Sequence, residues 1–271
     1  MAALPDAVIG PLWSAFEGLL MEAFPVGDAK PHPLGCHRRK IPDRIVFERL
    51  VFMLVAAVSF RAMGDHVVSE KTLRNRRKLW VEAGIFTKLE RLVLDVYDDI
   101  VGLDLANLSV DGCHGKAPLG GEIAGRSPVD RAKGGMKRSN MVDGNGVPLG
   151  TVVATGNSHD SPLLGSTLVL LEPLQDRLPA IVTVHLDAGY DSIKTRTMLN
   201  LMGYHYDISQ KGVPLQTGAR WLVERLNAWQ NLGYRKLAYM TERTHQNATA
   251  WVSFANAIIT LKRLIATLGR R

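Results

Sequence analysis

The sequence has 271 residues, 46% of them apolar, so it can bury a sizeable core as one or two domains. Its two cysteines lack metal-ligand spacing, which argues against a zinc module. No apolar run reaches the ~20 residues that cross a bilayer, which argues against a membrane protein. The N-terminus shows no secretion signal, which argues against a secreted protein. The net charge of +7, with 9 basic and 2 acidic residues in 216–271, predicts a polyanionic partner.

The first part of the chain is predicted to be helical. Hydrophobic periodicity indicates helices at Asp6–Ala23, Asp43–Val58, Ser69–Ala83 and Phe86–Ile100, and no strand signal appears before about Asp104. Residues 1–104 are therefore expected to form an all-α region.

A helix-turn-helix pattern lies within this region. SFRAMGDHVVSEKTLRNRRKLWVEAG, from Ser59 to Gly84, predicts a short helix, a turn through Gly64 and a basic second helix capped by Ser69. In such motifs the second helix contacts phosphates and base edges, and a plain three-helix bundle is the alternative. The side chains expected to contact DNA are Arg74, Asn75, Arg77 and Lys78.

After Leu105 the pattern changes to strands alternating with helices. Strands are predicted to end at Asp111 and Asp187, a hairpin to turn on Asp143–Gly146, and a further strand to cover Tyr204–Ser209. Helices are predicted at Pro162–Gln175, Ser192–Met202 and Ala219–Gln230. This order predicts an α/β fold with a mixed sheet flanked by helices. Three acids are expected to be structural: Asp143 in its turn, and Asp160 and Asp191 as helix caps.

Three other acids are candidates for chemistry. Asp111 and Asp187 each follow an apolar strand, and open α/β sheets bind ligands at the carboxyl ends of their strands. Glu224 borders the buried stripe of its helix, where an acid needs a partner. Three neighbouring carboxylates would repel one another unless cations shared the site, and two Mg²⁺ ions would resolve this and act on a phosphodiester. For each strand acid alone, an exposed structural carboxylate is the competing interpretation.

Several blocks resemble, in order, those of bacterial insertion-sequence DDE transposases, most closely the insertion-sequence-five type. They are SVDG at Ser109–Gly112, GGMKRSNMVDGNGVPLG at Gly134–Gly150, GNSHDSPLL at Gly156–Leu164, LDAGYDS at Leu186–Ser192 and RWLVERLNAW at Arg220–Trp229. The resemblance covers roughly Ile41–Leu264. It implies a ribonuclease-H-like catalytic domain over residues 105–271, with Asp111, Asp187 and Glu224 as catalytic metal ligands for Mg²⁺, which Mn²⁺ can replace.

The resemblance also implies DNA contacts in the second half of the chain. The candidates are Lys137, Arg138, Arg220, Arg225, Arg235 and Lys236. For Arg220 and Arg225, a helix-surface pairing with Glu224 is an equal alternative. Thr217 and Asn231 stand where the related signature has Tyr and Lys, and Arg235 or Lys236 is expected to supply the missing charge.

A glycine-rich basic segment, Cys113–Met136, follows the first strand acid. It lacks the GxxxxGK[ST] pattern of a P-loop. The segment is interpreted as a mobile loop that closes on DNA, with a disordered insertion as the alternative.

These observations predict a DNA transposase that cleaves and joins transposon ends by two-metal-ion chemistry. Its expected partners are double-stranded DNA, namely terminal inverted repeats and target DNA, and further copies of itself on DNA; no membrane partner is expected. Its expected location is the bacterial cytoplasm, at the nucleoid. Two alternatives remain: a helix-turn-helix regulator without catalysis, and a ribonuclease-H-like nuclease that only hydrolyses.

Overall fold

The computed structural model describes residues 3–25, 40–128, 130–210 and 220–270. Its helical first part contains α1 (Asp6–Ala23), α2 (Asp43–Ala56), α3 (Phe60–Met63), α4 (Glu70–Glu82) and α5 (Ile85–Ile100). The four helices expected here are confirmed, with ends that differ by one or two residues, as helix ends commonly do. Thr217 lies outside the described residues.

The expected helix-turn-helix path is present in the backbone. Ser69 caps α4, because its side chain accepts a hydrogen bond from the Thr72 amide at 3.2 Å. The preceding turn is closed by Asp65, whose carboxylate accepts from the amides of Val67 and Val68 at 2.9 Å each. These local side-chain bonds fix α4 relative to α3.

The second part is built on one mixed sheet. Its strands are β1 (Asn107–Lys116), β2 (Gly125–Arg126), β3 (Gly134–Val142), β4 (Pro148–Thr155), β5 (Thr183–Leu186) and β6 (His205–Ile208). The main order is β4-β3-β1-β5-β6, and the short β2 also pairs with β3. The pairs β1–β3 and β3–β4 are antiparallel, whereas β1–β5 and β5–β6 are parallel. The expected α/β fold class, a mixed sheet flanked by helices and preceded by an all-α region, is confirmed.

The prediction that the first strand ends at Asp111 is wrong. β1 continues to Lys116 because its antiparallel ladder with β3 runs without interruption from Ser109 to that residue. Only the parallel pairing with β5 stops early, at Ser109. Asp111 therefore lies inside a strand, two residues past the point where β5 leaves it. The same ladder also corrects the interpretation of the glycine-rich segment Cys113–Met136 as a loop. Its first residues belong to β1 and its last residues belong to β3.

The helices of the second part differ from the expected ones mainly at their ends, except that the helix predicted at Pro162–Gln175 is divided into an α-helix and a 3-10 turn. They are α6 (Asp160–Val169), α7 (Ile193–Leu201), α8 (Trp221–Gly233), α9 (Arg235–Ala238) and α10 (His245–Leu268), with short 3-10 turns η1 (Glu172–Arg177) and η2 (Ala188–Tyr190). The cap of α7 is Ser192, which accepts from the Thr195 amide, and not Asp191. Asp143 is structural as expected: its carboxylate accepts from the amides of Asp104, Asn145 and Val147.

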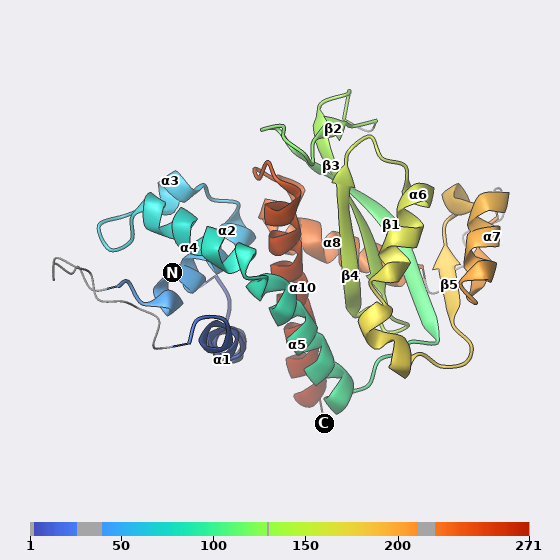
Figure 1. The fold of residues 1–271 in the computed structure, drawn as a ribbon, viewed down its shortest axis with the longest axis horizontal. Coiled ribbons are helices and arrows are strands. Elements are labelled where there is room, and N and C mark those ends of the chain that lie inside the picture. Colours follow the sequence, from blue (N-terminus) through green and yellow to red (C-terminus); the bar gives the residue numbers. More distant parts are fainter. Residues whose placement is uncertain (1–2, 26–39, 129, 211–219, 271) are drawn as a thin grey trace.

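Helices cover both faces of the sheet. Asn140 of β3 is hydrogen-bonded to α8, and Ser139, the next residue along the strand, to Thr167 of α6. Successive strand residues point to opposite faces, so α8 and α6 lie on opposite sides. Figure 1 shows α6 and α7 on one side of the sheet.

The long helix α10 was not predicted, and it joins the two parts of the molecule. It lies between α5 and β4 (Figure 1). Its Phe254 ring lies 5.1 Å from Phe86, 5.5 Å from Phe47 and 6.4 Å from Phe16. By length and composition alone α10 could cross a membrane, which the sequence did not lead us to expect, but most of it is buried inside the molecule as a core helix.

Candidate active site

The three candidate acids come from three elements that meet beside the end of β5. Asp111 is in β1, Asp187 directly follows β5, and Glu224 is in the first turn of α8. Burial raises the pKa of Asp111 to about 6; the Gly112 amide opposes this, while the neighbouring charges of Asp160, Glu224 and Asp187 add to it. The predicted triad is therefore electrostatically coupled, together with a fourth acid.

That fourth acid, Asp160, was expected only to cap a helix. The cap of α6 is His159, without a side-chain cap bond, so the capping prediction is wrong. Instead, the Asp160 carboxylate lies against Gly112, where any Cβ would overlap it. Lys137 Nζ donates to Asp160 Oδ2 at 2.7 Å, while Oδ1 is buried with no hydrogen-bond partner in the described part of the chain. Asp160 lies in the HDSP part of a block that resembles transposases, which could have marked it as a site residue. Its contact with Gly112, however, depends on the fold.

A guanidinium bridges two of the acids. Arg220 lies 3.2 Å from Asp187 Oδ1 through Nη1 and 3.0 Å from Glu224 Oε1 through Nη2. It also donates to Ser209 Oγ at 3.0 Å. The helix-surface pairing of Arg220 with Glu224 is thus present, and the same cation reaches the strand acid as well.

Asn227, one turn after Glu224, contacts the third acid. Its Nδ2 donates to Asp111 Oδ2 at 3.0 Å, while its Oδ1 accepts from Asn140 Nδ2 at 2.6 Å. A hydrogen bond from an amide favours the ionised form of the carboxylate and fixes its orientation. Asn227 lies within the RWLVERLNAW block, but no role could be assigned to it from the sequence, because that role depends on α8 packing across β1.

The hydrogen bonds continue from Asn140 into the helical part. Asn140 donates to Gln230 Oε1 at 2.9 Å, and Gln230 donates to Asn256 Oδ1 of α10 at 2.8 Å. Asn256 in turn donates to Glu90 Oε1 of α5 at 2.8 Å. Burial raises the pKa of the Glu90 carboxyl. A single polar network therefore runs from Asp111 to α5.

The donor chemistry of this site fits a hard divalent cation. All four acids offer carboxylate oxygens, the ligands that Mg²⁺ prefers, and one buried Asp160 oxygen has no protein partner among the described residues. Within those residues, however, no three His, Cys, Asp or Glu side chains are close enough together to form a coordination sphere. The charges of the four acids therefore influence one another, but their carboxylates do not surround a single metal position in this structure.

The predicted DNA contacts divide into exposed, half-buried and buried side chains, and Arg220 and Arg225 are half-buried. Arg74, Asn75, Lys78 and Arg235 are exposed. Arg74 pairs with Glu70 at 2.7 Å and Lys78 with Glu82 at 3.7 Å, both on the surface of α4. Such exposed pairs contribute little and exchange readily, so these cations are accessible to phosphates.

Two of the predicted contacts are buried together. Arg77 Nη1 lies 2.9 Å from Glu242 Oε2, and Lys236 Nζ lies 3.3 Å from Glu242 Oε1. Trp251 also donates to Glu242, at 3.0 Å. Arg77 and Lys236 are therefore not exposed for the predicted DNA contact in this structure, because both cations are enclosed by protein and neutralise a buried acid.

Lys137 and Arg138, adjacent on β3, are also buried. Lys137 is committed to Asp160 on one face of the sheet. On the other face Arg138 donates to Asn231 Oδ1 at 2.6 Å and to Cys113 Sγ at 3.2 Å. Neither is exposed to DNA, in contrast to the prediction. Asn231 stands where the related signature has Lys, and the cation that contacts it is Arg138. Arg138 lies on β3, so the spacing of residues along α8 could not identify it.

Comparison with known proteins shows a similarity to transposases. Residues 109–214 match the family described as the transposase DDE domain. The chain is 32% identical over 133 residues to a putative transposase for insertion sequence element IS402 of Burkholderia cepacia, a match that covers 44% of this chain and 59% of that relative. The chain thus spans about three fifths of this relative and is similar to insertion-sequence transposases of the DDE type.

Two solved structures share a distant likeness. The Mos1 transposase catalytic domain, in a structure with raltegravir and Mg, has a TM-score of 0.34 and 9% identity over 67% of this chain and 92% of that one. The piggyBac transposase, in a synaptic complex with hairpin DNA, has a TM-score of 0.34 and 12% identity over 96% of this chain and 67% of that one. Both TM-scores are below 0.5, so nothing about the site is inferred from them.

Proposed function

We propose that this protein is a DNA transposase that cleaves and joins transposon ends, with Asp111, Asp187 and Glu224 as its catalytic carboxylates. The observation that carries this proposal is that acids from three separate elements, Asp160, Asp187 and Glu224, lie close enough to Asp111 for their charges to raise its pKa. A structural role gives no reason to gather four acids beside the end of β5, since their mutual repulsion is unfavourable. The match of residues 109–214, which include Asp111 and Asp187, to the transposase DDE domain supports a transposase.

We assign Mg²⁺, with Mn²⁺ as a substitute, to the three carboxylates. When bound, the ions would activate the attacking oxygen and stabilise the leaving oxygen of a phosphodiester. The protein itself orients Asp111 through Asn227 and restrains Asp160 through Lys137. Arg220 neutralises part of the negative charge of Asp187 and Glu224.

The two parts of the chain take different roles in this proposal. Residues 1–104 bind the terminal inverted repeats through the exposed α4 side chains, and residues 105–271 carry out catalysis and take up target DNA. The accessible α4 side chains Arg74, Asn75 and Lys78 support this division. We place the protein with the insertion-sequence-five type, acting as a homo-oligomer on DNA at the bacterial nucleoid.

A joining assay with the element's own ends tests the proposal. The full-length protein is incubated with labelled end DNA and a target plasmid in Mg²⁺, Mn²⁺ or chelator. Joined products in either metal, absent in chelator and with Asp187→Asn, are expected. Cleavage without joining would identify a nuclease, and end binding without cleavage would identify a regulator; either result would refute the transposase assignment.

A further inference from the structure

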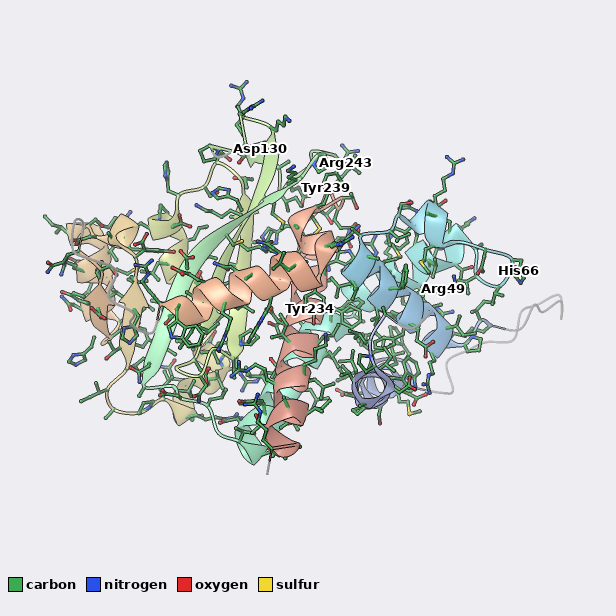
Figure 2. The ribbon with its side chains drawn as sticks, turned by 180° about the vertical axis from the view of Figure 1, so that it is seen from behind. Arg49, His66, Asp130, Tyr234, Tyr239 and Arg243 are labelled. Atoms are coloured by element: carbon green, nitrogen blue, oxygen red, sulfur yellow. The ribbon has the colours of Figure 1, made fainter. Side chains whose placement is uncertain are left out.

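A basic groove lies between α8 and α10, on a different side of α8 from the acids. Its volume is about 530 Å³, and among its lining side chains are four cations and two aromatic rings. These are Arg225, Lys262, Arg263, Arg270, Trp229 and Tyr234. Its lining, as far as the chain is described, contains no acid. Tyr234, labelled in Figure 2, lies between α8 and α9 in the chain, and its ring contacts Lys262 of α10.

Two of the four cations are held in fixed positions. Arg225 and Arg263 lie over the Trp229 ring, with Cζ to centroid distances of 4.8 Å and 5.5 Å. Both guanidiniums also donate to the Asn145 carbonyl oxygen, at 2.9 Å and 2.7 Å respectively. Cation–π contacts and a shared acceptor restrict these side chains, so little conformational entropy remains to be lost when a ligand binds.

The positive charge of the groove is incompletely balanced. Burial lowers the pKa of Arg225, and the nearby charge of Arg263 lowers it further, with Asp143 opposing. That carboxylate is already engaged by three amides of its turn. The Nε atoms of Arg225 and Arg263 are buried and have no hydrogen-bond partner in the described part of the chain. An anion in the groove would relieve this repulsion and offer acceptors.

Two further cations extend the groove along α10. Lys262 is exposed, with Nζ 5.7 Å from the Tyr234 ring centre, and Arg270 is exposed just beyond the helix end. They are eight positions apart in the chain, which corresponds to roughly 12 Å of helix rise. That distance exceeds a single phosphate and corresponds to several nucleotides of a DNA strand, at roughly 3.4 Å each along the axis. The groove is therefore suited to a chain of phosphates.

We propose that the α8–α10 groove binds the phosphodiester backbone of duplex DNA at a distance from the cleavage site. This inference rests on the proposed function. Glu224 and Arg225 are neighbours on α8, so their side chains project about 100° apart around the helix axis. DNA with one phosphate at the acids would continue around α8 into the groove, where Arg225, Arg263, Lys262 and Arg270 hold its backbone.

Equilibrium binding of a 20-base-pair duplex to the full-length protein, in chelator and across a salt series, tests the groove. The groove variant is Lys262→Gln with Arg270→Gln; both side chains are exposed, so folding is retained, and melting temperatures verify this. The matched control is Lys194→Gln with Arg196→Gln on α7. We expect the groove variant to bind about tenfold more weakly, with the slope of log affinity against log salt reduced by about 2. The control should stay within about twofold of the parent.

Three results would overturn the groove assignment. Groove and control variants that bind equally would remove it while leaving the transposase proposal intact. Failure of the parent protein to bind any duplex would remove both proposals together. Labelled poly-glutamate that binds as tightly as DNA, with the same dependence on Lys262 and Arg270, would show a site for acidic polypeptides instead of a DNA backbone site.

Discussion

Asp111 is the residue at which the charges of the site meet. Its pKa of about 6 lies above the ordinary value of 3.8, first because it is buried and then because of the surrounding acids. The folded protein therefore holds this proton more tightly than the unfolded chain does. The free energy of unfolding consequently falls as the pH rises from about 4 to about 6.

Asp111→Asn is expected to stabilise the metal-free protein at neutral pH. Asparagine keeps an oxygen that accepts from Asn227 but carries no charge, so the gain should be on the order of 2–3 kcal/mol above pH 6 and close to zero below pH 4. Urea unfolding of both proteins between pH 3.5 and 7.5, in chelator, measures this. A stability difference independent of pH would contradict the raised pKa.

Glu224→Gln separates the two interpretations of the helix acid. The Glu224 side chain is 55% exposed and pairs with Arg220, and such surface pairs contribute at most ~0.5 kcal/mol. If Glu224 is the third ligand, the substitution should reduce strand cleavage by orders of magnitude while the melting temperature stays near that of the parent. Normal cleavage by the same preparation would leave Glu224 with only its surface ion pair.

At the scale of elements, α8 connects the acids to the rest of the fold through its polar face. Asn227→Ala removes the donor to Asp111, so the pKa of that carboxyl should rise and the acid limb of the pH–rate profile of cleavage should move to higher pH. We expect cleavage at neutral pH to fall on the order of tenfold with unchanged DNA affinity.

The control for this prediction is Asn227→Ser, which keeps a short donor on the same helix face. Partial recovery of the rate and of the pH profile is expected. A rate loss in Asn227→Ala that came with an unshifted pH profile would indicate a purely structural role for Asn227.

The elements differ in how far the sequence could predict them. Helices of the first part follow local periodicity and caps such as Ser69, so their ends were found almost to the residue. The extension of β1 was missed because Gly112 and Gly115 are typical of loops, whereas the pairing that makes a strand comes from β3, far along the chain. Helix α10 was missed because it is buried on most sides and lacks the amphipathic stripe of a surface helix.

The site was predictable only in part for a related reason. Asp187 and Glu224 could be identified from a strand end and a helix edge. The positions of Asp160 and Asn227 depend on two helices that pack on opposite faces of the sheet. Burial of Arg77 could not be read from α4, because its partner Glu242 is 165 residues away.

At the scale of the whole molecule, the ion cluster of Arg77, Lys236 and Glu242 joins the helical first part to the second part. Removing one partner of a buried pair leaves the other without compensation, so Arg77→Ala should destabilise the protein by about 3 kcal/mol. Arg74→Ala should leave stability within about 0.5 kcal/mol, because its pairing is exposed.

The same two variants should differ in DNA binding. Arg74→Ala is expected to weaken binding to the terminal repeats, whereas Arg77→Ala should affect binding only in proportion to its unfolded fraction. Thermal melting and equilibrium binding on matched preparations measure both effects. A stable Arg77→Ala protein with weakened DNA binding would restore Arg77 as a direct contact.

The position of α10 has a consequence for synthesis of the protein on the ribosome. The aromatic rings of α1, α2 and α5 pack against Phe254, so these early helices cannot complete their core until residues 245–268 have been translated. A fragment of residues 1–104 should therefore bind a hydrophobic dye strongly, whereas the full chain should not. Under the proposed function, a gene copy truncated upstream of α10 would yield no stable DNA-binding fragment, and so no competitor of the intact protein for transposon ends.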